Sequence, residues 1–197
     1  MKSLRFILPF LVLSLSTLAS AQSGAVFPAA QSAAQKPSPT TAQSSFDQLK
    51  SLAGTWEGPV TMPGADPSMP PMRIHIVLRV TSTGNAIHHE MTIDGRPDDP
   101  ITMFYLDGDR LLATHYCDAG NRPRFAARVS PDGKTFDLDF LDISGPLDKG
   151  HMNHIAFTFI DANHHTEEWS MLAPDGKSMQ ARFDLTRAKE STPTRGN

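Results

Sequence analysis

One nine-residue stretch constrains the fold of this chain more than any other. Between Met72 and Val80, the apolar residues Met, Ile, Ile, Leu and Val occupy every second position. Successive side chains of a β-strand point to opposite faces, so this alternation is typical of a strand with one buried face. A helix would repeat its apolar residues every three or four positions instead. The segment therefore predicts a strand that borders a core.

Similar short segments recur along the chain, separated by turn residues such as Asp94-Gly95 and Pro131-Asp132-Gly133-Lys134. Gly and Asn adopt the positive φ that hairpin turns require. Many short strands with turns between them form either a sandwich or an up-and-down barrel. We predict an all-β fold, an up-and-down antiparallel β-barrel of about ten strands, the other nine being Thr55–Thr61, Ala86–Ile93, Ile101–Leu106, Leu111–Cys117, Arg124–Val129, Thr135–Leu141, His154–Ile160, Thr166–Leu172 and Met179–Arg187.

The N-terminus has the pattern of a cleavable signal peptide over residues 1–21. Lys2 and Arg5 precede an apolar run, and Ala19-Ser20-Ala21 matches the small-residue cleavage pattern. The apolar run is shorter than the ~20 residues that span a bilayer. We therefore expect an exported protein, periplasmic or secreted, that is soluble after cleavage and has no stable membrane insertion.

The remaining chain divides by composition into a linker, a domain and a tail. Residues 22–45 are rich in Ala, Ser, Gln and Pro, which predicts a disordered linker, and residues 189–197 predict a disordered tail. The barrel domain is expected over 46–188. Phe46, Leu49 and Leu52 are spaced three apart, which predicts a short helix that ends at Gly54.

Charge and cysteine content exclude some functions. The net charge is -3 and no basic cluster is present, which argues against nucleic acid as a partner. Cys117 is the only cysteine, so the domain has no internal disulfide and must be stable through core burial. The sequence gives no indication of the oligomeric state.

Two segments at the ends of the domain carry a family resemblance. Gly54 and Trp56 open the first strand after the short helix, and Arg187 shares the buried parity of the last strand. This arrangement resembles the lipocalin-like, or calycin, barrels, in which an Arg of the last strand packs across the Trp. The resemblance implies structural roles for Gly54, Trp56 and Arg187, and a central cavity for small apolar ligands.

Two further resemblances are weaker in what they imply. The opening Leu52-Ala53-Gly54-Thr55-Trp56-Glu57-Gly58 is similar to that of nitrobindin-type haem-binding barrels. No histidine of this chain can be matched to the haem ligand of those proteins. The segment Thr114-His115-Tyr116-Cys117 resembles exported bacterial proteins of unknown function, which implies no activity.

Alternation places several polar residues on predicted core faces. His89 lies between Ile87 and Met91, and Glu167 shares its face with Trp169. His165 joins that face if its strand begins early, and Asn153 is inward if the strand His154–Ile160 is extended backwards. For Leu111–Cys117 either parity is possible, and we take Leu111, Ala113, His115 and Cys117 as inward because cysteine is usually buried. Our predicted ligand-binding residues are His89, His115, Asn153, Glu167, Tyr105 and Cys117.

These residues admit three functions. The first is binding of a small, partly apolar molecule, which we take as the best interpretation, with ligand and cofactor unknown. The second is an enzyme in which the inward His89–Glu167 pair serves as acid or base. The third is a metal or haem site, for which His89, His115 and Glu167 are suitable ligand types but lack paired spacing within one strand. We assign no metal ligands and no catalytic residues from the sequence.

Overall fold

The computed structural model describes residues 41–66, 68 and 70–189. The predicted signal peptide, the linker as far as residue 40 and the tail from residue 190 lie outside the described residues. One α-helix, α1 (Thr41–Lys50), precedes ten strands. These are β1 (Gly54–Thr61), β2 (Met72–Thr81), β3 (Ala86–Ile93), β4 (Ile101–Asp107), β5 (Arg110–Tyr116), β6 (Arg122–Val129), β7 (Thr135–Ser144), β8 (His151–Asp161), β9 (His164–Leu172) and β10 (Ser178–Arg187).

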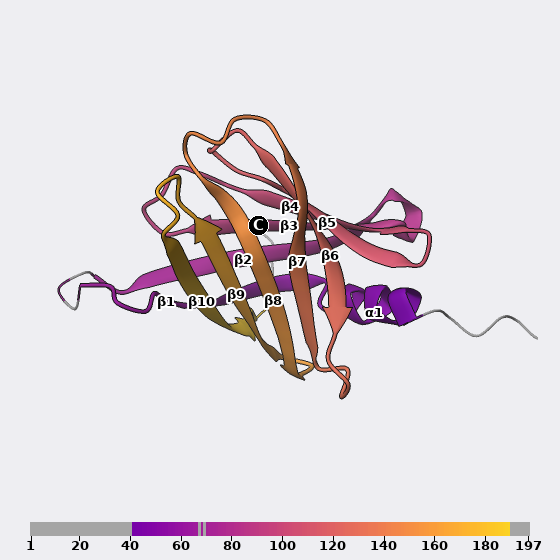
Figure 1. The fold of residues 1–197 in the computed structure, drawn as a ribbon. Coiled ribbons are helices and arrows are strands. Elements are labelled where there is room, and N and C mark those ends of the chain that lie inside the picture. Colours follow the sequence, from indigo (N-terminus) through magenta and orange to yellow (C-terminus); the bar gives the residue numbers. More distant parts are fainter. Residues whose placement is uncertain (1–40, 67, 69, 190–197) are drawn as a thin grey trace, which may run out of the picture. The chain divides into compact units, whose positions relative to one another are not determined.

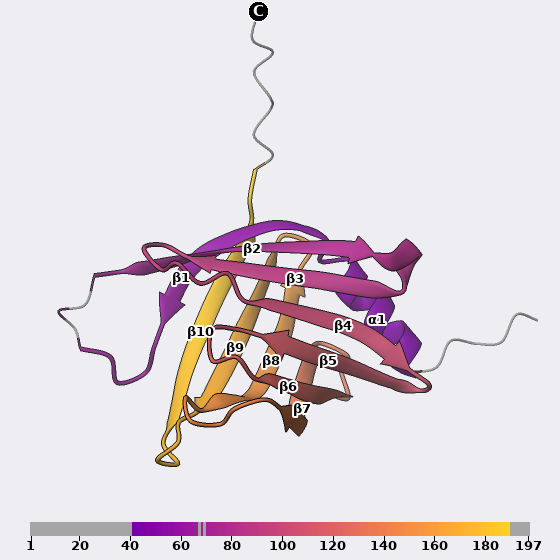
Figure 2. The same cartoon turned by 90° about the horizontal axis from the view of Figure 1, so that it is seen from above.

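The ten strands form one closed antiparallel barrel, which confirms the predicted fold class. Each strand pairs with its neighbours in the chain, and β1 pairs with β10 to close the sheet. Figures 1 and 2 show the strands from two directions, with α1 beside the ends of β4 and β5. A short 3-10 turn, Ser82–Gly84, connects β2 to β3. Closure leaves none of these ten strands at an edge of the sheet.

The helix is longer than the sequence indicates. It begins at Thr41, within the range assigned to the linker, rather than at Phe46. The hydroxyl of Ser45 donates to the backbone oxygen of Thr41 at 2.8 Å, and Ala42 packs against the core. Phe46, Leu49 and Leu52 are buried, so the predicted spacing identified the packing face but not the first turn.

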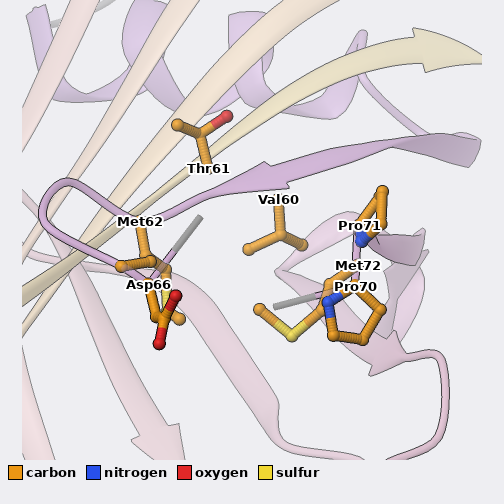
Figure 3. A pocket seen from close by; sticks show the side chains of 8 residues that line it. Val60, Thr61, Met62, Asp66, Pro70, Pro71 and Met72 are labelled. Carbon is orange, nitrogen blue, oxygen red and sulfur yellow. The ribbon is translucent and has the colours of Figure 1, made fainter. Parts of the chain in front are cut away.

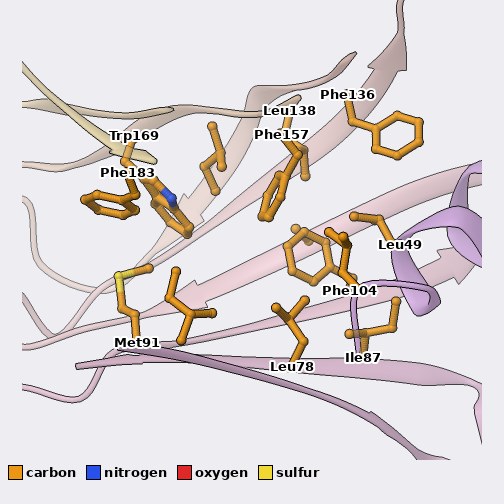
Figure 4. Close-up of a cluster of buried hydrophobic side chains, with 14 of the residues drawn as sticks. Leu49, Leu78, Ile87, Met91, Phe104, Phe136, Leu138, Phe157, Trp169 and Phe183 are labelled. Atoms are coloured by element: carbon orange, nitrogen blue, oxygen red, sulfur yellow. The ribbon is translucent and has the colours of Figure 1, made fainter. Parts of the chain in front are cut away.

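The barrel interior is filled by apolar side chains from every strand. Figure 4 shows Leu49 of α1 among residues of several strands, including Ile87, Phe104 and Phe157. We call the barrel end covered by α1, where β1 begins, the helix end, and the other end the open end. Interior positions alternate with exterior ones along each strand, as the period of two requires.

Two glycines of β1 are required by close contacts with β10. A Cβ at Gly58 would lie 1.9 Å from the backbone oxygen of Asp184, which leaves no room for any side chain. Gly54 has φ +141°, and a Cβ there would lie 2.4 Å from Nη1 of Arg187. Glycine is the residue that tolerates both the positive φ and the close approach.

Candidate functional site

Arg187 and Trp56 join the first and last strands at the helix end. They are paired in the β1–β10 register, and the guanidinium carbon of Arg187 lies 4.2 Å from the centre of the Trp56 ring. Arg187 also donates to the backbone oxygens of Ala53, Ser51 and Ala162. The indole of Trp56 is fully buried and donates to the oxygen of Leu52 at 2.8 Å. This contact has the geometry implied by the lipocalin-like resemblance, and it closes the barrel at the end that α1 covers.

Glu167 is the centre of a polar group inside the barrel. Nε2 of His89 lies 3.2 Å from both carboxylate oxygens, and Nε2 of His165 lies 3.1 Å from Oε1. Nε1 of Trp169 donates to Oε2 at 2.9 Å. The side chains of Glu167, His89 and His165 have no exposed surface. In the folded chain, hydrogen bonds from His89, His165 and Trp169 therefore replace the water that would otherwise solvate the Glu167 carboxylate.

These donors keep Glu167 ionised. Burial by itself raises the pKa of this carboxyl, but the charge of His89 and hydrogen bonds from His165 and His89 outweigh burial and lower the pKa to about 2. An ionised carboxylate only accepts hydrogen bonds. It follows that Nε2 of His89 and Nε2 of His165 both carry the hydrogen that points to Glu167.

His115 lies beside this group, on the interior face of β5. Its Nδ1 is 2.8 Å from the hydroxyl of Thr102, and its ring centre is 5.2 Å from that of Trp169. Burial, with a smaller effect from the charge of His89, lowers the pKa of His115 to about 3. His115 is therefore neutral at neutral pH. Leu111 and Ala113 share its face and belong to the core, so the preferred parity is correct for Leu111, Ala113 and His115. Leu112 on the opposite face is also buried, and Cys117 lies beyond the end of β5.

Each of the three buried imidazoles keeps one nitrogen without a hydrogen-bond partner among the described residues. The atoms are Nδ1 of His89, Nδ1 of His165 and Nε2 of His115. Most buried polar atoms in proteins have a partner, so three such atoms close together in one core require an explanation. We call Glu167, His89, His165 and His115 the interior polar group.

The other predicted ligand-binding residues lie elsewhere. Cys117 follows β5 at the open end and is half-buried, and burial raises the pKa of its thiol. Tyr105 lies between Phe104 and Leu106, which pack in the core, so its ring is on the outer face, where its hydroxyl is 3.2 Å from that of Thr114. Tyr105 is therefore not part of the interior polar group, and its role in ligand binding stays a prediction.

The interior position predicted for Asn153 is wrong, because its side chain is exposed. The register between β8 and β9 pairs Met152 with Met171 and then His154 with Ser170, which leaves Asn153 as an extra residue. A β-bulge of this kind reverses the alternation on one side of it. Met152 takes the interior place instead, and packs against the core.

Two hollows lie at the open end, and none of the predicted ligand-binding residues lines either of them. One, of about 240 Å³, is formed by Val60 and the segments on either side of the β1–β2 connection (Figure 3). The second, of about 410 Å³, lies between residues 62–65 and 178–180. Neither hollow borders any residue of the interior polar group.

Metal and haem fit the interior polar group poorly. Within the described residues, no group of three His, Cys, Asp or Glu side chains has an arrangement that could hold a metal ion. The ring of His89 is surrounded by the rings of Phe104, Phe157 and Trp169, with centre-to-centre distances of 6.2, 6.0 and 5.7 Å. These residues do not fit a haem beside His89, because the space that a macrocycle needs is occupied by side chains.

Comparison with known proteins adds information about the fold. No family model matches the sequence, and no curated protein matches it. Among solved structures, Rv2717c from M. tuberculosis is 14% identical, with a TM-score of 0.56 over 74% of this chain and 98% of that chain. The chain has a lipocalin-like barrel fold. At this identity the likeness shows the fold alone.

Two other solved structures cover similar shares of the chain. The S-type phycobiliprotein lyase CPES from Guillardia theta is 11% identical, with a TM-score of 0.47 over 77% of this chain and 99% of that chain. A designed fluorescence-activating β-barrel is 13% identical, with a TM-score of 0.37 over 72% and 98%. Their TM-scores are too low to support an argument about this chain. In the part that the structure describes, no helix has the length and apolar content needed to cross a bilayer.

Proposed function

We propose that this chain is an exported barrel protein that binds a small, partly apolar molecule in its interior. The observation that carries the proposal is the set of three buried imidazole nitrogens, of His89, His165 and His115, that have no hydrogen-bond partner among the described residues. A ligand that hydrogen-bonds to them would supply the partners that the protein does not. The signal-like N-terminus supports export.

The chemistry of the interior polar group restricts the ligand. Glu167 already accepts from two imidazoles and an indole, so it orients the rings rather than meeting the ligand. Nδ1 of His89 or His165 can bind a polar group of the ligand, as an acceptor in a neutral imidazole or as a donor in an imidazolium. Phe104, Phe157 and Trp169 pack around His89 in the ligand-free chain, so a ligand reaches the interior polar group only if these rings move aside. Once displaced, the rings suit an apolar or aromatic remainder.

Native mass spectrometry of protein purified from its own host tests this proposal. We expect a small molecule to co-purify and to appear in an organic extract. Glu167→Gln should lower its occupancy, because an amide cannot accept from both imidazoles with the strength of a carboxylate. Asp184→Asn is the matched control, since Asp184 is also a carboxylate bonded to a histidine, His164, but on the exposed surface. Wild-type protein that is folded and carries no molecule would overturn the proposal.

One observation favours acid–base catalysis as a second candidate. Glu167 fixes the hydrogen of His89 on Nε2 and leaves Nδ1 without a partner, which is the arrangement of a general base held by a carboxylate. Incubation of the extracted molecule with fresh protein, followed by mass spectrometry, separates the candidates. Turnover that His89→Gln abolishes while binding persists supports catalysis, whereas unchanged ligand supports binding alone.

A further inference from the structure

Methionines gather at the open end of the barrel. Nine occur in the chain, and apart from Met1 and Met69 all of them lie in the part that the structure describes. Of these seven, only Met103 is on the outer face of its strand. Five lie at the open end: four on β8, β9, β10 and β2, and Met62 directly after β1, which lies between β10 and β2. We call them the methionine arc: Met152, Met171, Met179, Met62 and Met72.

Strand register places three members of the methionine arc in one row. Met152 is paired with Met171, and Met171 is paired with Met179. Residues paired across an antiparallel sheet have side chains on the same face, with Cβ atoms about 5 Å apart. Met171 shares the parity of the buried Trp169, so this face is the interior one. Three thioether side chains therefore stand beside one another on the inner wall.

The two hollows connect one member of this row, Met179, to Met62 and Met72. Met179 and Met62 line the hollow of about 410 Å³, and Met62 and Met72 line the hollow of about 240 Å³ (Figure 3). Met179 is 54% exposed, so its thioether is accessible from outside. Methionine has flexible torsions, which allow neighbouring sulfur atoms to converge on one point.

We propose that the methionine arc binds a soft monovalent metal ion, copper(I), through the thioethers of Met152, Met171 and Met179. Thioether sulfur is a soft, uncharged ligand that selects copper(I) over the harder divalent ions. A divalent ion would keep its full charge among neutral ligands, and removing it from water would cost more than for a monovalent ion. Met179 is the one proposed ligand that lines the 410 Å³ hollow, and the other residues of that hollow, Met62, Pro63, Gly64, Ala65, Ser178 and Gln180, have no charged side chain.

The experiment uses the full chain with silver(I) as an air-stable probe and copper(I) under ascorbate as the second arm. Cys117→Ser is the starting variant, because a thiol would bind these ions by itself. Methyl signals of 13C-labelled methionine report which thioethers bind. We expect one ion per chain, with shifts at Met152, Met171 and Met179 and no shift at Met103.

Variants separate a built site from scattered binding. Met171→Leu removes the central sulfur but keeps the apolar volume, so the fold should persist. Met171→Leu should weaken ion binding by at least about tenfold, because even substitutions of residues that only support a metal ligand have an effect of that size. Met103→Leu is the matched control and should bind like the starting variant.

The proposal fails if the ions shift only histidine signals, if Met171→Leu binds as well as Met103→Leu, or if an apolar molecule but no ion shifts the methionine methyls. The readout is independent of the interior polar group. A folded chain without a co-purifying molecule would overturn the proposed function and leave this inference standing. A chain that carries such a molecule but binds no ion at the methionines would overturn this inference and leave the proposed function standing.

Discussion

His89 and Glu167 form a hydrogen bond across the barrel interior, between strands that do not pair with each other. His89 belongs to β3 and Glu167 to β9, and β2, β1 and β10 separate them along the sheet. The link therefore fixes the distance between two walls in a way that strand pairing alone does not. It also orients the ring of His89, because the carboxylate can only accept.

Glu167→Gln should lower the free energy of unfolding by about 2–3 kcal/mol. Two buried imidazoles and the Trp169 indole lose a charged acceptor, and buried polar groups left poorly paired cost about 1–3 kcal/mol each. Urea unfolding followed by circular dichroism measures the change. Asp184→Asn should leave stability nearly unchanged, because exposed ion pairs contribute little. Equal effects of the two substitutions would contradict the account of the buried carboxylate.

Stability should fall on acidification in two steps. The pKa of His115 is lowered from 6.5 to about 3, so below pH 6.5 the unfolded chain binds a proton that the folded chain refuses. The pKa of Glu167 is lowered from 4.5 to about 2, so its ionised form stabilises the fold above pH 4.5, and this contribution is lost as the pH falls towards 2. Both shifts make the folded protein less stable at lower pH.

His115→Gln isolates the first step. Between pH 6.5 and 4.5 the variant should lose stability less steeply than the wild type, while below pH 4.5 the Glu167 step remains. Melting temperatures across this pH range provide the measurement. Parallel curves for variant and wild type above pH 4.5 would show that His115 does not titrate as its burial requires.

Trp56→Ala should destabilise the barrel by about 3–5 kcal/mol, because a fully buried aromatic side chain is lost. Arg187→Lys should also destabilise, since an ammonium cannot stack on the indole while donating to three carbonyl oxygens. In a double-mutant cycle the two substitutions should be less than additive, because they remove one shared contact. Strict additivity would mean that the stacking contributes nothing.

Asn153→Ala should change stability by less than about 0.5 kcal/mol and leave ligand occupancy unchanged, because its side chain is exposed at a bulge. Native mass spectrometry beside the Glu167 variant checks the occupancy. Loss of the co-purifying molecule in this variant would return Asn153 to the binding site.

The fold was predictable because alternation and turn chemistry are local signals, and the ten segments were identified from them. The inward direction of His89 and Glu167 followed from the same parity. Their contact did not, because parity gives the face of a strand and not the height of a residue in the barrel or the partner across it. His165, Thr102 and the Trp169 indole were missed as partners for this reason, although an early start of β9 already pointed His165 inward.

Two predicted ligand-binding residues lie outside the interior polar group, for separate physical reasons. Asn153 sits at a bulge, and one extra residue reverses the parity of everything before it with no local signal in the sequence. Tyr105 belongs to Ile101–Leu106, in which both faces are largely apolar, so alternation does not distinguish inside from outside. Phe104 is buried in the core, and this places the neighbouring Tyr105 on the outer face.

The most direct test of the central claim is imidazole 15N NMR on the ligand-free chain, before and after the organic extract of host-purified protein is added back. The account predicts that Nδ1 of His89 or His165 and Nε2 of His115 shift on addition, while the surface imidazoles of His75 and His154 do not. Unchanged signals from all three interior imidazoles in a folded chain would contradict it.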